Sequence, residues 1–495
     1  MKISTLCVLS LGLSLAVLSD AHGAKHQNTD SASQHHTGGA SRHKNDQHHH
    51  HQNVESPFHG EAASIPAKPY QPKHSKQNPK KSAQPTPKAE PATVVPEVPT
   101  QRQPAPQPEP EVTGPTPAVG KKEKMVVAYW TDWTSGAMPP EAIPFDKVTH
   151  VNYAFSVVSP DFRPVFETDY LLNRVVRLAH QKNVKVLISI GGWTGSQYFS
   201  PLAASSQGRK TFIDGAVQMV KDNHLDGIDI DWEYPGRLGS ACNKFDEAHD
   251  SENFLTLLIE LRSALNALPD GSKLEISLAT RIVPFDGPNG LMKDVSAFSK
   301  VVNHINVMAY DINGSWGTVT GANAPFGGPG QLNYAGGAQA WIDAGFPPQQ
   351  INMGVPFYGR SLITQQDMVH AESMAAPFEK TVPIGDNNDG LWTDPCEKTA
   401  AYSGVWKYRN LREQGVIDAA GVAIAPWVRR FDEDSQTPWL FNPKTRQFIS
   451  YDDRQSLQAK VEYAKQKDLG GLMLWAINQD TSDFELLDVL QGVRE

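Results

Sequence analysis

The sequence has no tryptophan before Trp130, although the whole chain contains eleven. Large apolar side chains are also scarce in residues 24–121, so burial there cannot offset the conformational entropy that folding would cost. This segment is rich in histidine, glutamine, lysine and proline instead, and sixteen of the 37 prolines fall between Pro57 and Pro117. We therefore expect residues 24–121 to form a long disordered His/Pro-rich arm, which is a semi-extended spacer in its proline-rich part.

Long apolar runs and an excess of positive charge are missing as well. Beyond the N-terminus, no run approaches the roughly eighteen apolar residues that a membrane-spanning helix needs. From Lys121 onward, 34 lysines and arginines stand against 45 aspartates and glutamates, a net charge of −11. Because an acidic surface repels polyanions, we expect no nucleic-acid partner.

The N-terminus has the features of a secretory signal. Lys2 provides a positive start, residues 3–18 are mostly apolar, and the small residues Ala21, Gly23 and Ala24 suit cleavage. We predict a signal peptide at residues 1–23 and a secreted protein, extracellular or held in a periplasm, without membrane contact after cleavage. The alternative is an N-terminal membrane anchor.

Cysteine and histidine each leave two interpretations open. Of the three cysteines, only Cys242 and Cys396 remain after removal of the signal. A secreted context permits them to pair, and the alternative is two unrelated thiols. The run from His48 to His51 is compatible with weak binding of Zn²⁺, Cu²⁺ or Ni²⁺ by the arm, and the alternative is a solvated polar tail.

From Met125 the pattern changes to short apolar runs separated by helix-like segments. Buried parallel strands have nearly continuous apolar sequences, and alternation with helices indicates a parallel sheet. Eight such units in residues 122–495 predict an α/β fold, a (β/α)₈ TIM barrel. More than a hundred residues separate the seventh and eighth runs, which predicts an inserted subdomain at 358–452. The runs are Met125–Trp130, Val148–Phe155, Val184–Ile190, Gly227–Trp232, Leu274–Ala279, Ile305–Tyr310, Ile351–Val355 and Gly471–Trp475.

An acidic motif occupies the fourth run, where residues 226–233 have the sequence DGIDIDWE. Alternate residues of a strand share a face, so Asp229, Asp231 and Glu233 point one way and apolar residues point the other. Burial of several carboxylates at close range forces some of them to hold protons. Glu233 lies nearest the C-terminal mouth, where barrel active sites lie. We predict that Glu233 is a proton donor, kept protonated near neutral pH by Asp229 and Asp231, which share one proton.

This motif resembles the D-x-x-D-x-D-x-E signature of glycoside hydrolase family eighteen, the chitinases. Ser189–Trp193 is similar to the S-x-G-G motif of the family, Met308–Asp311 is similar to its M-x-Y-D motif, and Trp475 stands where the family has a sugar-platform tryptophan. The insertion resembles the small α+β domain of the bacterial type. The resemblance covers about residues 125–492 and leaves the first 120 residues unexplained.

The resemblance implies a substrate-assisted, retaining hydrolysis of β-1,4 bonds in N-acetylglucosamine polymers, without a cofactor or a metal. The 2-acetamido oxygen of the substrate attacks the anomeric carbon, and Glu233 is the general acid and then the general base. Asp231 binds the acetamido N–H, Asp229 holds the proton of Asp231 in exchange, and Tyr310 donates to the acetamido oxygen.

The resemblance also implies a set of sugar-binding residues, because flat aromatic surfaces bind the apolar faces of pyranose rings. We expect Trp475 under the distorted sugar, Trp193 and Trp316 on the leaving-group side, and edge contacts from Asp311 and Arg360. We expect Tyr129 and Ser189 beneath, near the aspartates, with Met308 at the substrate, and we interpret Trp341 as a core residue. Among Trp392, Trp406, Trp427 and Trp439 the sequence does not identify which line the cleft.

Three alternative functions remain at this point. An endo-β-N-acetylglucosaminidase acting on N-glycans uses the same barrel, but the deep insertion together with Trp193 and Trp316 favours a linear polymer. A chitin-binding, lectin-like relative typically lacks the terminal acid, which is present here as Glu233. A metal-chelating role of the arm would leave the acidic motif unexplained.

Overall fold

The computed structural model describes residues 123–394, 396 and 398–495. The predicted signal peptide and the predicted arm, including its histidine run, lie outside the described residues. Within the described part, no helix is both long enough and apolar enough to cross a membrane.

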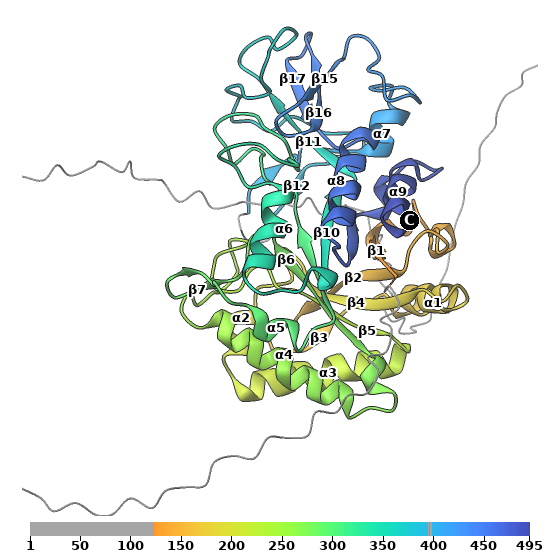
Figure 1. Cartoon of the computed structure of the whole chain (residues 1–495), viewed down its shortest axis with the longest axis vertical. Helices are drawn as coiled ribbons and strands as arrows, with labels where there is room; N and C mark the ends of the chain where they lie inside the picture. Colours follow the sequence, from red (N-terminus) through yellow and green to blue (C-terminus); the bar gives the residue numbers. More distant parts are fainter. Residues whose placement is uncertain (1–122, 395, 397) are drawn as a thin grey trace, which may run out of the picture. The chain divides into compact units, whose positions relative to one another are not determined.

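Eight parallel strands close into a barrel (Figure 1). β1 pairs in parallel with both β2 and β18, so the first and last of these strands complete the ring. Each strand coincides with one predicted apolar run, which confirms the (β/α)₈ TIM barrel. The strands are β1 (Met125–Thr131), β2 (His150–Val158), β4 (Lys185–Gly191), β5 (Gly227–Asp231), β6 (Glu275–Arg281), β9 (His304–Met308), β10 (Ile351–Pro356) and β18 (Gly471–Trp475).

The helices lie on the outside of the barrel and bury one face of each strand. Along β1, Val126 and Trp130 belong to the cluster that includes the helices, whereas Val127 and Tyr129 belong to a second cluster inside the barrel. Trp341 is fully buried, in agreement with its interpretation as a core residue. The helices are α1 (Asp169–His180), α2 (Phe199–Ala203), α3 (Ser206–Asn223), α4 (Asp250–Asn266), α5 (Ser296–Ser299), α6 (Tyr334–Asp343), α8 (Arg454–Gln466) and α9 (Glu485–Leu490).

Side-chain caps determine where several helices begin. The Ser205 hydroxyl accepts a hydrogen bond from the Gly208 amide, so α3 begins earlier than its apolar pattern alone indicates. Asp453 and Ser456 form a reciprocal capping box at the start of α8. Short 3₁₀ turns complete the connections: η1 (Asp132–Thr134), η2 (Pro140–Ala142), η3 (Gly271–Lys273), η4 (Pro348–Gln350), η5 (Ile477–Gln479) and η6 (Gln491–Arg494).

A second, antiparallel sheet lies between β10 and α8, within the range where the sequence places the insertion. Its strand order is β14-β11-β17-β16-β15, and α7 (Tyr408–Glu413) follows β14. The five strands are β11 (Tyr358–Ile363), β14 (Val405–Lys407), β15 (Val428–Asp432), β16 (Thr437–Asn442) and β17 (Gln447–Ser450). Short pairs add β12 (Trp392–Thr393) with β13 (Ala400–Ala401), β7 (Asp286–Gly287) with β8 (Gly290–Leu291), and β3 (Pro164–Val165) with β2.

A buried ion pair joins the end of this sheet to the barrel. Lys460 on α8 is fully buried, and its ammonium group lies 2.6 Å from Asp452 Oδ1 and donates to the Ala324 carbonyl at 2.8 Å. Because each charge has a partner, burial of the pair is tolerated, and loss of either partner would leave the other charge uncompensated.

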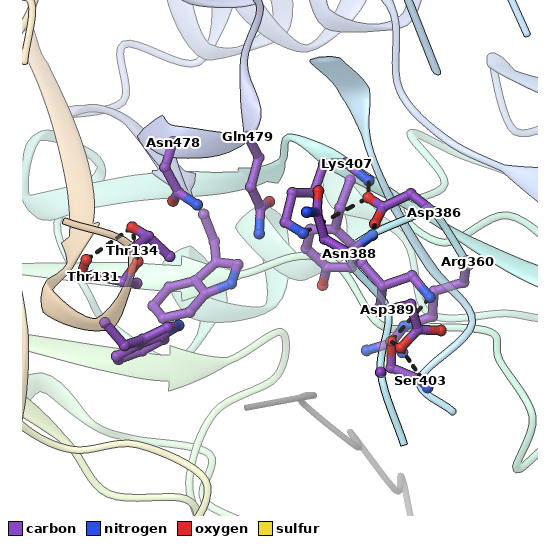
Figure 2. A pocket seen from close by; sticks show the side chains of 15 residues that line it. Thr131, Thr134, Arg360, Asp386, Asn388, Asp389, Ser403, Lys407, Asn478 and Gln479 are labelled. Atoms are coloured by element: carbon purple, nitrogen blue, oxygen red, sulfur yellow. Dashed lines mark hydrogen bonds and ion pairs between the residues drawn. The ribbon is translucent and has the colours of Figure 1, made fainter. Parts of the chain in front are cut away.

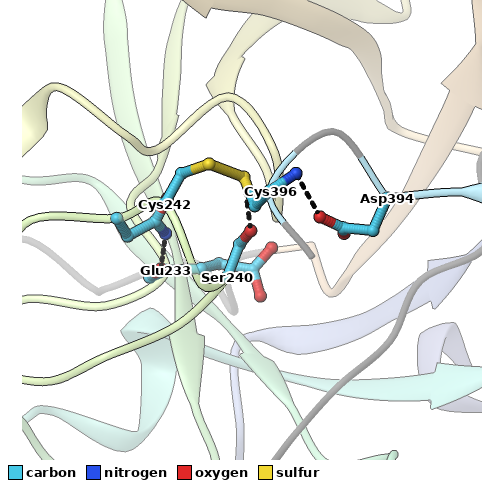
Figure 3. Close-up of a disulfide and its surroundings, with 6 residues drawn as sticks. Glu233, Ser240, Cys242, Asp394 and Cys396 are labelled. Carbon is cyan, nitrogen blue, oxygen red and sulfur yellow. Dashed lines mark hydrogen bonds between the residues drawn. A yellow bond between two sulfur atoms is a disulfide. The ribbon is translucent and has the colours of Figure 1, made fainter. Parts of the chain in front are cut away.

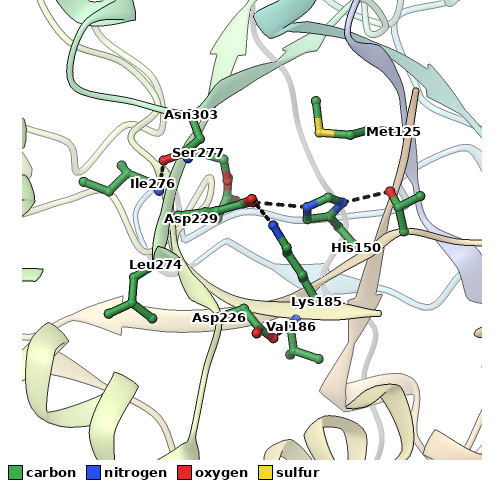
Figure 4. Close-up of polar contacts among 12 residues, drawn as sticks. Met125, His150, Lys185, Val186, Asp226, Asp229, Leu274, Ile276, Ser277 and Asn303 are labelled. Atoms are coloured by element: carbon green, nitrogen blue, oxygen red, sulfur yellow. Dashed lines mark hydrogen bonds and ion pairs between the residues drawn. The ribbon is translucent and has the colours of Figure 1, made fainter. Parts of the chain in front are cut away.

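A second buried acid lies at the N-terminal ends of the barrel strands. Glu275, the first residue of β6, pairs with His150 at 3.1 Å and with Lys185. Figure 4 shows the dashed lines from His150 and Lys185 converging. Burial alone would raise the pKa of Glu275, but hydrogen bonds and charges from His150, His304 and Lys185 outweigh it and lower the pKa. Glu275 is therefore a charged structural group.

Candidate active site

The acidic motif lies on β5 and on the residues that follow it, at the C-terminal mouth of the barrel. Asp229 is fully buried, and four side chains donate hydrogen bonds to its two oxygens. The donors are Tyr129 Oη at 2.7 Å, Ser189 Oγ at 2.7 Å, Ser277 Oγ at 2.6 Å and Asn306 Nδ2 at 3.5 Å. Tyr129 and Ser189 therefore lie beneath the aspartates, where the sequence analysis expects them.

The next acid along the strand has a different environment. Asp231 is buried, and within the described structure its Oδ1 atom has no hydrogen-bond partner. Burial, followed by the charges of Glu233 and Asp229, raises the pKa of Asp231 well above its ordinary value. Burial also raises the pKa of Asp229, but its hydrogen-bond donors oppose that effect. Because no hydrogen-bond donor among the described residues opposes the shift at Asp231, protonation is favoured at Asp231 over Asp229.

Glu233 is held so that it can donate a proton near neutral pH. Burial raises its pKa to about 7, a hydrogen bond from Tyr234 opposes the shift, and the charge of Asp311 adds to it. A general acid is most effective when its pKa lies close to the working pH.

The backbone of Glu233 is anchored on both sides. Its amide donates to Ser196 Oγ at 2.9 Å, and its carbonyl accepts from Asn243 Nδ2 at 2.8 Å. Ser196 and Asn243 are not predictable from the sequence, because they lie 37 and 10 positions from Glu233 and no local pattern marks them. Tyr234 was missed although it directly follows Glu233.

A pocket opens directly above these acids, and we call it the catalytic pocket. Seven of the predicted residues line it together with Glu233: Tyr129, Trp193, Asp231, Met308, Tyr310, Asp311 and Trp475. The rings of Trp475 and Phe155 stack at 5.7 Å between centroids, which holds Trp475 at the pocket floor.

Two predicted residues, Arg360 and Trp316, meet beside the catalytic pocket. The Arg360 Nε atom donates to Asp311 Oδ1 at 2.6 Å, and Tyr358 Oη donates to the same oxygen at 2.6 Å. The Arg360 guanidinium lies 5.0 Å from the Trp316 ring centroid, a cation–π contact that fixes the indole. Trp316 itself is not among the residues that line the pocket.

A second pocket, the insertion-side pocket, shares Trp475 and Tyr358 with the catalytic pocket. Figure 2 shows its two walls, one from the barrel with Thr131, Thr134, Asn478 and Gln479, and one from the insertion with Arg360, Asp386, Asn388, Asp389, Ser403 and Lys407. Trp133 also lines it, and the sequence analysis missed this residue, although it follows β1 closely as Trp193 follows β4.

The two carboxylates that line the insertion-side pocket accept hydrogen bonds from neighbouring groups of the protein. Asp389 accepts hydrogen bonds from the amides of Gly385, Ser403 and Gly404 and from the Ser403 hydroxyl. Asp386 accepts from the Lys407 amide at 2.9 Å. These acids therefore hold the wall together. None of Trp392, Trp406, Trp427 and Trp439 lines either of the two pockets.

A disulfide joins Cys242 to Cys396, with 5.1 Å between the Cα atoms (Figure 3). This finding decides the alternative that the sequence left open in favour of pairing. Among the residues that the structure describes, no group of three or more His, Cys, Asp or Glu side chains could hold a metal ion.

Comparison with known proteins gives concordant similarities. The model of Glycosyl hydrolases family 18 matches residues 125–480. A chitinase-like effector of Moniliophthora roreri is 34% identical over 381 residues, 74% of this chain and 91% of that protein. A chitinase structure from Rhizomucor miehei has a TM-score of 0.70 at 36% identity, covering 75% of this chain and 100% of that one. A Group IV chitinase of Ostrinia furnacalis, solved in complex with allosamidin, has a TM-score of 0.62 at 28% identity, with 75% and 98% covered.

Proposed function

The chain belongs to glycosyl hydrolase family 18, and on this premise we propose that it is a secreted chitinase that hydrolyses β-1,4 bonds between N-acetylglucosamine units. The observation that carries the proposal is the raised pKa of about 7 for Glu233, in a pocket with Asp231, Tyr310 and Trp475. One carboxylic acid is thus ready to donate a proton next to a flat aromatic floor that suits a pyranose ring.

In the proposed reaction the acetamido oxygen of the substrate attacks the anomeric carbon while Glu233 protonates the glycosidic oxygen. The bond to the leaving sugar breaks, and an oxazolinium ion forms. Water then opens this ion and gives a proton to Glu233, so the configuration is retained. Because the nucleophile belongs to the substrate, the site needs no second free carboxylate as nucleophile.

The two aspartates balance the charge of this intermediate. Asp231 accepts a hydrogen bond from the acetamido N–H group. It stabilises the positive charge of the intermediate as its own proton passes to Asp229. Three of the four donors to Asp229 are hydroxyl groups, which can rotate and accept a hydrogen bond. If Asp229 takes up a proton, one of these hydroxyl groups can therefore turn and accept a hydrogen bond from it, so that two donors do not face each other.

The paired pockets support a linear polymer as substrate. Trp475 and Tyr358 belong to both pockets, so a sugar chain can run from the catalytic pocket, which contains Trp193, to the insertion-side pocket, which contains Trp133. Tryptophan faces at both ends suit a repeating unbranched chain.

Product analysis of defined N-acetylglucosamine oligomers tests the proposal. We expect chains of four to six sugars to yield short oligomers that carry the β-anomer at first, with the Glu233→Gln variant as matched inactive control. An initial α-anomer would contradict the substrate-assisted route. Faster cleavage of an N-glycan core than of chitin oligomers would replace the proposal with the endo-β-N-acetylglucosaminidase alternative.

A second candidate is an oligosaccharide-binding protein without turnover, because one similar protein bears the name chitinase-like effector. The presence of Glu233, Asp231, Asp229 and Tyr310 favours hydrolysis. Binding of chitin oligomers by the wild-type protein at micromolar enzyme, with no product after prolonged incubation, would establish the second candidate instead.

Secretion is part of the same proposal and has support of its own. The Cys242–Cys396 disulfide suits an oxidising compartment, where such bonds persist. Sequencing the N-terminus of protein recovered from the culture medium tests it, and a start near Ala24 is expected. Protein retained in a membrane fraction with an intact N-terminus would support the anchor alternative.

A further inference from the structure

Two arginines line a part of the catalytic pocket that the insertion-side pocket does not share. Arg237 follows Glu233 by four positions, and Arg281 is the last residue of β6. Trp193 and Tyr234 line the same pocket and are also absent from the insertion-side pocket. The proposed reaction uses neither arginine, so the two charges need a separate explanation.

The chain folds so that both guanidinium groups meet one carboxylate. Arg281 donates to Asp286 Oδ2 in an ion pair, and the Arg237 guanidinium lies 3.8 Å from the same oxygen. Gly236 allows this approach, because its φ is +75° and a Cβ atom there would lie 3.2 Å from Asp286 Cβ. The Arg281 carbonyl accepts from Trp341 Nε1 at 3.1 Å. The backbone therefore fixes both arginines beside Asp286.

One carboxylate does not neutralise two guanidinium groups. Burial, and then the charge of Arg237, lowers the pKa of Arg281, but arginine stays charged in proteins. Both arginines line the catalytic pocket and Asp286 does not, so this wall presents a surplus positive charge. Among the described residues, the Arg237 guanidinium donates no hydrogen bond, since its ion pair at 3.8 Å is too long for one. Its N–H groups are therefore available to a ligand.

The acids that line the pocket leave this surplus charge in place. The pKa values of Glu233 and Asp231 are raised, which favours their neutral forms. Asp311 is already paired with Arg360. A group bound beside Arg237 therefore meets a positive field.

The arginines lie on the flank of Glu233 that faces the leaving sugar in the proposed reaction. Tyr234 donates to Glu233, and the Arg281 guanidinium lies 5.9 Å from the centroid of the Tyr234 ring. Glu233 gives its proton to the oxygen of the leaving sugar, and Trp193 is expected under that sugar. Carbon 2 of the leaving sugar carries either an acetamido group, whose oxygen accepts hydrogen bonds, or a protonated amine, which only donates.

We propose that Arg237 and Arg281 make the leaving-group side of the site selective for N-acetylated sugars and select against glucosamine there. Guanidinium N–H groups bind an acetamido oxygen, whereas an ammonium group opposes them in charge and in hydrogen bonding. The reaction itself requires an acetamido group only on the sugar that is attacked. This inference rests on the proposed function and narrows its substrate class to chains with consecutive acetylated sugars.

The test uses partially deacetylated chitosan at about pH 5, where amino groups carry a proton. Mass-spectrometric sequencing of the products identifies the first two sugars at each new non-reducing end, which come from the leaving-group side. We expect these sugars in the wild-type products to be strongly enriched in N-acetylglucosamine over the polymer. In Arg237→Gln we expect the ratio of glucosamine to N-acetylglucosamine at these ends to rise roughly tenfold. This ratio does not depend on the total rate, so altered turnover leaves the readout intact.

Three further variants separate charge from structure. Arg237→Lys keeps the positive charge, so we expect it to retain most of the discrimination. Asp286→Asn removes the neutralising carboxylate, so its ratio should fall below the wild-type value. Arg174→Gln breaks an exposed ion pair with Glu141 and is the matched control, with the wild-type ratio expected.

The possible outcomes distinguish the inference from the proposed function. Glucosamine at the new non-reducing ends in proportion to its share of the polymer would overturn the inference, and so would an unchanged ratio in Arg237→Gln. A rise in Arg237→Lys as large as in Arg237→Gln, or a rise in Asp286→Asn, would overturn selection by charge. Absence of any cleavage of fully acetylated chitin oligomers by the wild type would instead overturn the proposed function.

Discussion

Two buried glutamates at opposite ends of the barrel have opposite pKa shifts. Glu233 at the C-terminal mouth has its pKa raised to about 7 by burial, with a contribution from the charge of Asp311. Glu275 at the N-terminal end is also buried, but its pKa is lowered. Burial favours the neutral form in both cases, so burial alone does not decide the charge of a carboxyl group.

The neighbours of the two glutamates account for the difference. Glu275 faces His150 and Lys185, whose hydrogen bonds and charges favour the anion, with a further charge contribution from His304. Glu233 faces acids, and one tyrosine donates to it. The same residue type is therefore a structural anion at one end of the barrel and, in the proposed function, the acid catalyst at the other.

The largest effect is expected from Glu233→Gln, which removes the proton donor and keeps the shape. We expect kcat to fall by about 10²–10⁴-fold, the typical contribution of general acid catalysis. Steady-state kinetics on a chitin oligomer measure the loss, and circular dichroism with oligomer binding checks that fold and affinity remain. Near-normal turnover would remove Glu233 from its catalytic role.

Glu275→Gln should act on stability and leave the chemistry intact. Loss of a buried, charged hydrogen-bond partner should lower the free energy of unfolding by roughly 2–3 kcal/mol. Because the folded pKa is depressed, the contribution of Glu275 is complete above its ordinary value of 4.5 and is lost as pH falls through the folded pKa. Urea titrations should therefore show a smaller difference in free energy of unfolding between the wild type and Glu275→Gln at pH 4 than at pH 7.

The matched control is Glu260→Gln, which affects the partly exposed ion pair with Arg209. We expect this substitution to cost under about 1 kcal/mol. If Glu260→Gln and Glu275→Gln cost the same, the contrast between the two ends of the barrel would fail.

The pH dependence of the wild type and Glu233→Gln sharpens the comparison further. Because the folded pKa of Glu233 is raised, its stabilising contribution is present below 4.5 and is lost as pH rises through about 7. Unfolding experiments should show the free energy of unfolding of Glu233→Gln rising relative to that of the wild type between these pH values. At higher pH the difference between the two proteins should stay constant. In the wild type, kcat should decline above pH 7 as the acid loses its proton. If the difference in free energy of unfolding between the two proteins does not change across this pH range, Glu233 has an ordinary pKa.

The smallest effect is expected from Lys185→Met. The Lys185 side chain is 44% exposed, so water screens its attraction to Glu275. We expect a loss under about 1 kcal/mol in thermal unfolding, and a loss as large as that of Glu275→Gln would mean that the lysine, and not the histidines, keeps the glutamate charged.

The barrel and the acidic motif were predictable because each follows a short-range pattern. Eight apolar runs mark the strands, and the alternation of Asp229, Asp231 and Glu233 with apolar residues predicts three acids on one face of β5 and of the residues that follow it. Glu275 was not predictable as a buried anion. It is the second residue of the apolar run Leu274–Ala279, and its partners come from two other strands, 90 and 125 positions away.

Long-range contacts limited the prediction of the site in the same way. Arg360 contacts Asp311, which is 49 positions away in sequence, and the Arg360 guanidinium lies over the Trp316 ring and holds it in position. Trp133 differs, because its position shortly after a strand is a local signal that would have identified it.

The entry and exit strands of the insertion are neighbours in its sheet. β11 and β17 pair from Arg360 opposite Ser450 to Ile363 opposite Gln447, and β11 begins two residues after β10 ends. The insertion therefore meets the barrel at two adjacent points, as a short loop would. Its length and loops could change over evolution, or be exchanged in the laboratory, without moving any of the eight barrel strands, and Cys242 and Cys396 are then the pair that such an exchange has to retain.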